Sequence, residues 1–506
     1  MSNSRVKKAT YSIVALALYQ ITVFVCNLIL PRLIISKYGS EYNGMVSSIT
    51  QFLNFVGLLR IGVAGATRVE LYKSLGNNDI NQTSAIIKAT ELYMRKIAAI
   101  FLGYIILLSI IYPFVINSQY SYLEVASLVI IISIGTFAQY FFGLTYSTLL
   151  QADQKLYIYN VIQIVATVLN TIIACALIYR GFSIQIVKFG SAMIYTLSPI
   201  VLNIVVSKHY HLNKKVTPDN TALSKKRDVA AQSIANIVHE NTDVTVLTVL
   251  TDMKTVSVYA VYNLVINGLK QLTNIFTSGL ESAFGDMIVK KQRESLYKNL
   301  RLFDFLMNCF VMVAFSCALV LVIPFVKIYT KGVTDVQYII PSYAYIAILS
   351  LAIYCLRIPF LTVVHAAGHY KETKKAAYSE AIINLSLSIV LTTFCGIIGV
   401  GIGTLVANIF RTIHYQWYVA MNMLKEIKNI NLLKRFLWLI GTFSVIVVVN
   451  TIILKNVEFD KWLVWAEMAG LVFLISLVVC IISGGIFYKS DLMNALKLVK
   501  RMVSKG

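Results

Sequence analysis

A succession of long apolar stretches constrains this chain more than any other feature. A segment of about 20 mainly apolar residues is long enough to cross the hydrocarbon core of a bilayer. Such segments must satisfy their own backbone hydrogen bonds in lipid, so they are expected to be helical. We therefore predict an all-α polytopic membrane protein with about 14 transmembrane helices. The fourteen stretches cover approximately residues 11–35, 43–66, 95–116, 122–150, 156–179, 183–207, 229–251, 256–283, 301–328, 336–365, 376–396, 399–424, 436–454 and 462–488.

The charge composition supports this class. Only 13% of the residues are charged, whereas a soluble protein of this size carries roughly 25%. The net charge of +22 could suggest a nucleic-acid partner. However, the basic residues cluster between the apolar stretches, as they do in membrane proteins whose cytoplasmic loops are positively charged. We expect no nucleic-acid binding.

The distribution of Lys and Arg predicts the topology. If the N-terminus is cytoplasmic, 32 of the 45 basic residues fall in inner segments and eight in outer segments or their flanks. Every alternate loop has the same bias, and a wrongly counted span would invert it downstream. We therefore expect both termini in the cytoplasm.

A weak internal repeat predicts the domain organisation. When the chain is slid by about 215–219 residues, Gly39–Gly44 falls beside Val256–Val261, and Leu150–Lys155 falls beside His365–Lys371. Two six-span halves of equal orientation would be related by an axis along the membrane normal, with a cleft between them. The expected parts are an N-terminal six-helix lobe (1–207), a cytoplasmic linker (208–228), a C-terminal six-helix lobe (229–424), and two extra transmembrane helices with a cytoplasmic tail (425–506).

Five basic residues lie within the predicted spans. Arg32 lies near an outer end, where its side chain is expected to reach the membrane surface. The other four form the candidate substrate-binding site. Lys270 and Arg411 fall near the middle of their spans, whereas Arg60 and Arg357 lie near inner ends. A cationic cavity would suit an anionic head group, because the planar guanidinium can bond two phosphate oxygens at once. Arg411 is expected to contribute most. The alternative for Arg60 and Arg357 is that their side chains reach to the inner membrane surface.

Two acidic residues, Glu240 and Asp243, lie in the centre of the predicted seventh span. A carboxylate at the bilayer centre costs roughly 2.5–3.5 kcal/mol on insertion scales, so it should face a cavity or a partner. One interpretation is an ion pair, for example between Lys270 and either acid. The other is a direct role in binding a coupling ion.

The sequence indicates no catalytic, metal or cofactor site. All seven cysteines lie within apolar runs, and no CxxC motif occurs. His209 and His211 have no further ligands near them in the sequence. Walker, HExxH and GxSxG motifs are also absent from the sequence, so we expect neither an enzyme nor a cofactor.

Four short motifs in order resemble one family. They are Gly57–Arg68 (GLLRIGVAGATR), Leu149–Lys155 (LLQADQK), Asn241–Asp243 (NTD) and Ala366–Lys374 (AAGHYKETK). With fourteen spans and repeated halves, the whole chain resembles polysaccharide flippases of the Wzx type, in the superfamily that also contains MATE exporters and the lipid II flippase MurJ.

The resemblance implies a cargo and a location. The cargo would be an undecaprenyl-diphosphate-linked oligosaccharide, moved from the inner to the outer leaflet of the bacterial cytoplasmic membrane by alternating access. Capsule, O-antigen or exopolysaccharide synthesis would use it, with glycosyltransferases and a polymerase as partners besides membrane lipids. Three alternatives stay open: a lipid II flippase, a cation-coupled multidrug exporter, and a scaffold in a polysaccharide synthase complex that transports nothing.

Overall fold

The structure is almost entirely helical. This computed structural model describes residues 3–503 of the chain, apart from 61–62, 78, 211, 214, 220–240, 278–279 and 425–431. Its helices confirm the predicted all-α polytopic fold class. The chain divides into two compact units, of which the first ends at Ala260 and the second begins at Val261. The two units are described separately below.

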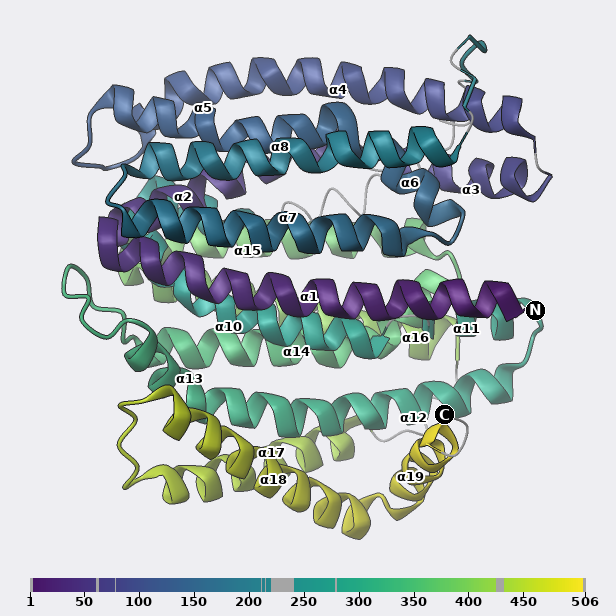
Figure 1. Cartoon of the computed structure of the whole chain (residues 1–506). Helices are drawn as coiled ribbons and strands as arrows, with labels where there is room; N and C mark the ends of the chain where they lie inside the picture. Colours follow the sequence, from purple (N-terminus) through teal and green to yellow (C-terminus); the bar gives the residue numbers. More distant parts are fainter. Residues whose placement is uncertain are drawn as a thin grey trace. The chain divides into compact units, whose positions relative to one another are not determined.

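The first unit contains long helices whose axes run roughly alongside one another (Figure 1). Helix α5 begins with a capping box, in which Ser121 and Glu124 bond each other's backbone N–H groups. The elements are α1 (Asn3–Tyr38), α2 (Ser40–Asn54), the 3₁₀ helix η1 (Phe55–Arg60), α3 (Val63–Gly76), α4 (Ile80–Val115), α5 (Tyr122–Ala138), the π-helical turn η2 (Gln139–Gly143), α6 (Leu144–Ala152), α7 (Leu156–Tyr179) and α8 (Ile184–His209).

The second unit holds the remaining helices, and α10 crosses the boundary into it. Helix α14 starts with Pro341, whose missing N–H costs nothing in a first helical turn. The elements are α10 (Met253–Thr277), α11 (Leu280–Val289), α12 (Arg293–Phe310), the π-helical turn η4 (Val311–Phe315), α13 (Ser316–Tyr329), α14 (Pro341–Ala366), α15 (Tyr370–Cys395), α16 (Ile397–Asn422), α17 (Leu432–Leu454), α18 (Trp462–Phe487) and α19 (Lys489–Val503).

Among the described residues, eleven helical segments are long and apolar enough to cross a membrane. They correspond to eleven of the fourteen predicted spans. The other three predicted spans are 43–66, 229–251 and 256–283. The first is divided among α2, η1 and α3, the second lies partly outside the described residues, and the third is mainly α10, a helix of 25 residues. Helix α10 is long enough to span but carries several polar residues.

Helix α2 is joined by hydrogen bonds to the segment 241–257 within the first unit. Asn43 donates to the Ser257 hydroxyl at 2.8 Å, and the hydroxyls of Ser48 and Thr248 lie 2.7 Å apart. These contacts explain why the first compact unit extends to Ala260. The division at 208–228 that the sequence repeat suggests stays a prediction.

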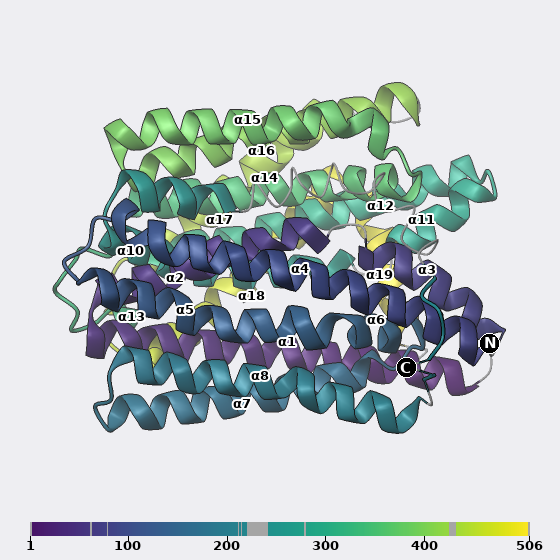
Figure 2. The ribbon, with the colours of Figure 1, turned by 90° about the horizontal axis from the view of Figure 1, so that it is seen from above.

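Small residues position three helices of the second unit. Helices α14, α15 and α16 pack side by side (Figure 2). Helices α15 and α16 form a hairpin that turns at Gly396, whose φ of 56° favours glycine. A Cβ on Gly399 would overlap the Leu391 carbonyl group, so the two backbones can approach this closely only with glycine there. The two helices are therefore joined by a very short turn, as the closely spaced predicted spans 376–396 and 399–424 require.

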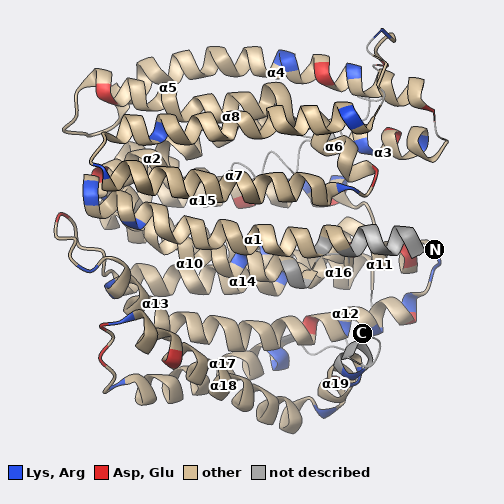
Figure 3. Cartoon of the chain, viewed as in Figure 1, with Lys and Arg blue, Asp and Glu red and all other residues tan. Residues whose placement is uncertain are grey.

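Most charged residues lie toward the ends of the long helices in each unit (Figure 3). The middles of these helices are mainly apolar, and many large apolar side chains there are exposed, as expected for surfaces that face lipid. A charged side chain buried at mid-helix is therefore an exception that needs an explanation.

Candidate functional site

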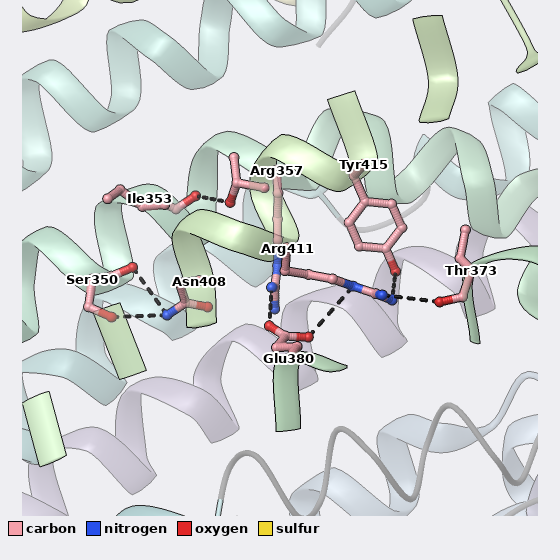
Figure 4. A network of polar contacts seen from close by, with 9 residues as sticks. Ser350, Ile353, Arg357, Thr373, Glu380, Asn408, Arg411 and Tyr415 are labelled. Atoms are coloured by element: carbon pink, nitrogen blue, oxygen red, sulfur yellow. Dashed lines mark hydrogen bonds and ion pairs between the residues drawn. The ribbon is translucent and has the colours of Figure 1, made fainter. Parts of the chain in front are cut away.

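Two arginines and one glutamate meet inside the second unit. Arg357 on α14 and Arg411 on α16 both point to Glu380 on α15 (Figure 4). The Nη1 of Arg357 forms a short ion pair with Oε1 of Glu380, and the Nε of Arg411 lies 3.6 Å from Oε2. Only 6% of Arg357, 3% of Glu380 and 1% of Arg411 is exposed. We call these three residues the central cluster.

Neighbouring polar groups hold the helices around this cluster. Asn408 donates to the Ser350 hydroxyl at 2.9 Å, and the Thr412 hydroxyl donates to the Ile353 carbonyl at 3.1 Å. Both bonds join α16 to α14. Because the glycines bring α15 against α16, three helices fix the positions of three charges that lie far apart in the sequence.

The central cluster lies deep within these helices. Glu380 is ten residues from the start of α15, which corresponds to about 15 Å at 1.5 Å per residue. The whole helix of 26 residues is about 39 Å long by the same measure. A carboxylate and two guanidinium groups at this depth are sheltered from both helix ends.

Arg411 has more partners than Arg357. Besides Glu380, Arg411 donates to the Thr373 carbonyl at 3.1 Å and to the Tyr415 hydroxyl at 2.7 Å. Its guanidinium also lies 4.3 Å from the centre of the Tyr415 ring. Arg357 bonds one carboxylate, that of Glu380, and otherwise rests on an aromatic ring.

That ring belongs to Tyr354 and connects the central cluster to Lys270. The Arg357 guanidinium lies 4.4 Å from its centre, and the Lys270 ammonium on α10 lies 5.9 Å from it. Lys270 and Tyr354 are half-buried, in contrast to the central cluster. The structure thus brings together three of the four predicted basic residues: Lys270, Arg357 and Arg411.

The other predicted site residues are placed differently. Asp243 is helical and half-buried in the first unit, where its carboxylate accepts a hydrogen bond from the Tyr259 hydroxyl at 3.3 Å. The backbone of Arg60 ends η1, but its side chain lies outside the described residues, as does the whole of Glu240. The substrate-binding and coupling roles remain predictions.

Sequence reasoning missed Glu380. It weighed the intramembrane basic residues against Glu240 and Asp243 alone, although Glu380 lies inside the predicted span 376–396. Its position among apolar residues was a sufficient signal. Without Glu380, an ion pair for Arg357 and Arg411 could not be anticipated.

A second buried cluster, also missed, lies elsewhere in the second unit. Arg435 on α17 pairs with Asp304 on α12 and, at 2.9 Å, with Asp491 on α19. The Nε of Arg301 lies 2.9 Å from the other oxygen of Asp491. We call these four residues the anchor cluster, because they join α17 and α19 to α12. Arg435 lies one residue before the predicted span 436–454, so it was not among the basic residues expected inside the spans.

The described part of the chain contains no group of three or more His, Cys, Asp or Glu side chains arranged to hold a metal ion. The ionisable groups of the central cluster instead contact one another and tyrosine rings. Their arrangement is suited to binding charge rather than to nucleophilic chemistry.

Comparison with known proteins identifies the fold. No family model and no curated protein matches the sequence. Among solved structures, the lipid II flippase MurJ in an inward closed conformation aligns with a TM-score of 0.72 and 16% identity, over 94% of this chain and 100% of that one. An inward-facing multidrug-resistance MATE transporter of the MOP superfamily aligns with a TM-score of 0.63 and 13% identity. That alignment covers 83% of this chain and 99% of the transporter. The eukaryotic MATE transporter AtDTX14 aligns with a TM-score of 0.59 and 13% identity, over 93% of this chain and 99% of that transporter.

These similarities extend over 83–94% of this chain, so they describe the fold of most of it. The chain is a multi-pass membrane protein with the helical fold shared by MurJ and MATE transporters. The low identities carry no information about cargo.

Proposed function

We propose that this protein moves an undecaprenyl-diphosphate-linked oligosaccharide from the inner to the outer leaflet of a bacterial cytoplasmic membrane by alternating access. The observation that carries the proposal is the buried excess of positive charge in the central cluster, where two arginines share one carboxylate. An anionic head group would complete the charge balance there, and Lys270 stands next to it.

The physical problem that such a protein solves is the transfer of polar groups through hydrocarbon. Each unsatisfied polar group in the bilayer core costs several kcal/mol, and a diphosphate with several sugars carries many of them. Basic side chains inside the protein would replace the hydration of the diphosphate while the polyprenyl tail stays in lipid. Lys270, Arg357 and Arg411 are the proposed contacts to the head group.

Lipid II, the cargo of the structurally similar flippase MurJ, is the second candidate cargo. Lipid II also carries a diphosphate, so the central cluster would suit either molecule. Multidrug export of cations is disfavoured, because the buried excess of positive charge would repel a cationic drug. A scaffold that transports nothing would have no use for a buried excess of positive charge.

Complementation distinguishes these functions. The gene is expressed in a strain that lacks its polysaccharide flippase and in a strain depleted of its lipid II flippase. We expect surface polymer to return in the first strain, scored with a polymer-specific stain, and no growth rescue in the second. The reverse result would assign lipid II as cargo. Failure in both strains at normal membrane abundance would contradict the proposal.

The proposed orientation can be tested separately. Reporter fusions after Lys215 and after Lys371 should report the cytoplasm, and a fusion after Lys331 should report the outside. These positions follow the bias of basic residues toward predicted inner loops. A reversed signal at any one of them would contradict a topology with both termini in the cytoplasm.

A further inference from the structure

The two arginines of the central cluster are not equivalent. Arg411 is held by the Thr373 carbonyl and the Tyr415 hydroxyl as well as by Glu380. Arg357 has Glu380 as its one bonded carboxylate and rests on the Tyr354 ring. Arg411 would therefore keep most of its partners if Glu380 moved, whereas Arg357 would keep only the ring.

The charge count of the cluster is uneven. One carboxylate can neutralise one guanidinium, and a buried charge without a partner is costly. The Nε of Arg357 is also buried without a hydrogen-bond acceptor among the described residues. The Nε of Arg435 in the anchor cluster is likewise buried without an acceptor. The central cluster is therefore distinguished by its unequal numbers of positive and negative charges.

The side of the cluster that carries Lys270 is the more accessible one. Lys270 and Tyr354 are half-buried, and the Tyr354 ring contacts both Lys270 and Arg357. An anion that enters past Lys270 would meet Arg357 before Arg411, which is 1% exposed. This order places Arg357, which is itself 6% exposed, on the Lys270 side of the pair.

We propose that Arg357 is the arginine that binds the anionic head group, and that Glu380 is a placeholder counter-ion for it. When the anion arrives, Glu380 leaves Arg357 and pairs fully with Arg411, whose Nε already lies 3.6 Å from its Oε2. One phosphate charge then pairs with Arg357, and the second faces Lys270. Arg411 acts as a positioning residue that receives Glu380.

This exchange deepens the proposed function, on which it rests for the identity of the cargo. Its physical advantage is that Glu380 neutralises one of the two guanidinium groups while the site is empty, so only one of them lacks a counter-charge. Binding replaces an internal carboxylate by an external phosphate, so the empty and loaded states have similar costs. A carrier with such states can release its cargo as well as bind it.

Binding of inorganic pyrophosphate to the purified full chain in nanodiscs tests the exchange by calorimetry. Glu380→Gln removes the competing carboxylate and should tighten binding by about tenfold to a hundredfold, the range of one charge-assisted hydrogen bond. Arg357→Gln should weaken binding by a similar factor. Arg411→Gln should also weaken it, because Glu380 then has no second partner.

The double variants separate a binding residue from a positioning residue. Adding Glu380→Gln to Arg411→Gln should restore tight binding, since no carboxylate remains to be displaced. Adding it to Arg357→Gln should not restore binding. If Glu380→Gln fails to fold, Glu380→Asp keeps the charge on a shorter side chain and should tighten binding by a smaller factor.

The matched control is Asp304→Asn in the anchor cluster, which removes an equally buried carboxylate and should leave the affinity unchanged. The exchange is overturned if folded Glu380→Gln binds pyrophosphate no more tightly than the original chain. Unchanged affinity in Arg357→Gln, or no binding by any variant, also overturns it. Complementation tests the cargo independently, so intact pyrophosphate binding without restored surface polymer would reject the proposed function and keep the exchange.

Discussion

The second unit contains two buried arginine clusters that differ in their charge count. The anchor cluster has two arginines and two aspartates, and each of its carboxylates is paired. The central cluster has two arginines and one glutamate. Both are assembled from three helices, but Arg301 in the anchor cluster is 43% exposed, whereas all three members of the central cluster are buried.

The difference indicates two uses of the same residue types. A balanced cluster satisfies itself and joins the helices that carry its members. A cluster with more positive than negative charges can still attract an external anion, because no internal carboxylate compensates the desolvation cost of its second guanidinium. The first unit offers a neutral counterpart, since the Gln163 amide on α7 donates to the Ser198 hydroxyl on α8 at 3.1 Å.

The largest effect is expected from breaking the anchor cluster. Arg435→Leu leaves Asp304 buried without its cationic partner, which should cost about 3–5 kcal/mol. We expect low membrane abundance and a much lower melting temperature in detergent. Arg435→Leu combined with Asp304→Leu removes both charges and should recover much of the stability. Normal stability of the single variant would show that this cluster is not an anchor.

Removal of Glu380 should cost more stability than removal of Arg357. Glu380→Gln leaves two guanidinium groups without a carboxylate, at a cost of about 3 kcal/mol. Arg357→Gln leaves Glu380 paired with Arg411, so its cost should be about 1 kcal/mol or less by the value of a single net hydrogen bond. Melting curves of the two variants measure these losses of stability. Added pyrophosphate should raise the melting temperature of Glu380→Gln more than that of Arg357→Gln. Equal losses would mean that the central cluster behaves like the anchor cluster.

The approach of α15 to α16 can be loosened without changing any charge. Gly399→Ala places a Cβ against the Leu391 carbonyl group, and such overpacking costs about 1–3 kcal/mol. We expect a lower melting temperature and weaker pyrophosphate binding, because Glu380 shifts relative to Arg411. Gly441→Ala on α17 is the control, since no heavy atom lies within 4 Å of its added Cβ. If both variants behave alike, the helix spacing does not matter to the cluster.

The smallest effect is expected from an exposed ion pair in the same unit. Lys298 and Glu294 lie 2.6 Å apart on α12, but their side chains are 71% and 81% exposed. Exposed pairs of this kind contribute little, because water and salt screen them. Glu294→Gln should therefore leave the melting temperature and the pyrophosphate affinity unchanged within error. A clear loss would show that distance alone, rather than burial, decides the value of these pairs.

Much of the fold could be predicted because its signals are local. Long apolar runs predicted the eleven spans found among the described residues. The break of the second span into α2, η1 and α3 was not predicted. Hydropathy measures how apolar a segment is, but it does not report where a helix changes its geometry.

The sequence by itself determined that this is a helical membrane protein with a few costly charges inside its spans. Each apolar run carries its own transfer free energy, so length and composition suffice for that conclusion. Only the tertiary structure decided which charges meet. Arg357, Glu380 and Arg411 lie on three different helices, and Asp304 is 131 residues from Arg435. Whether a buried arginine is balanced depends on neighbours that helix packing supplies, and a linear sequence does not specify that packing.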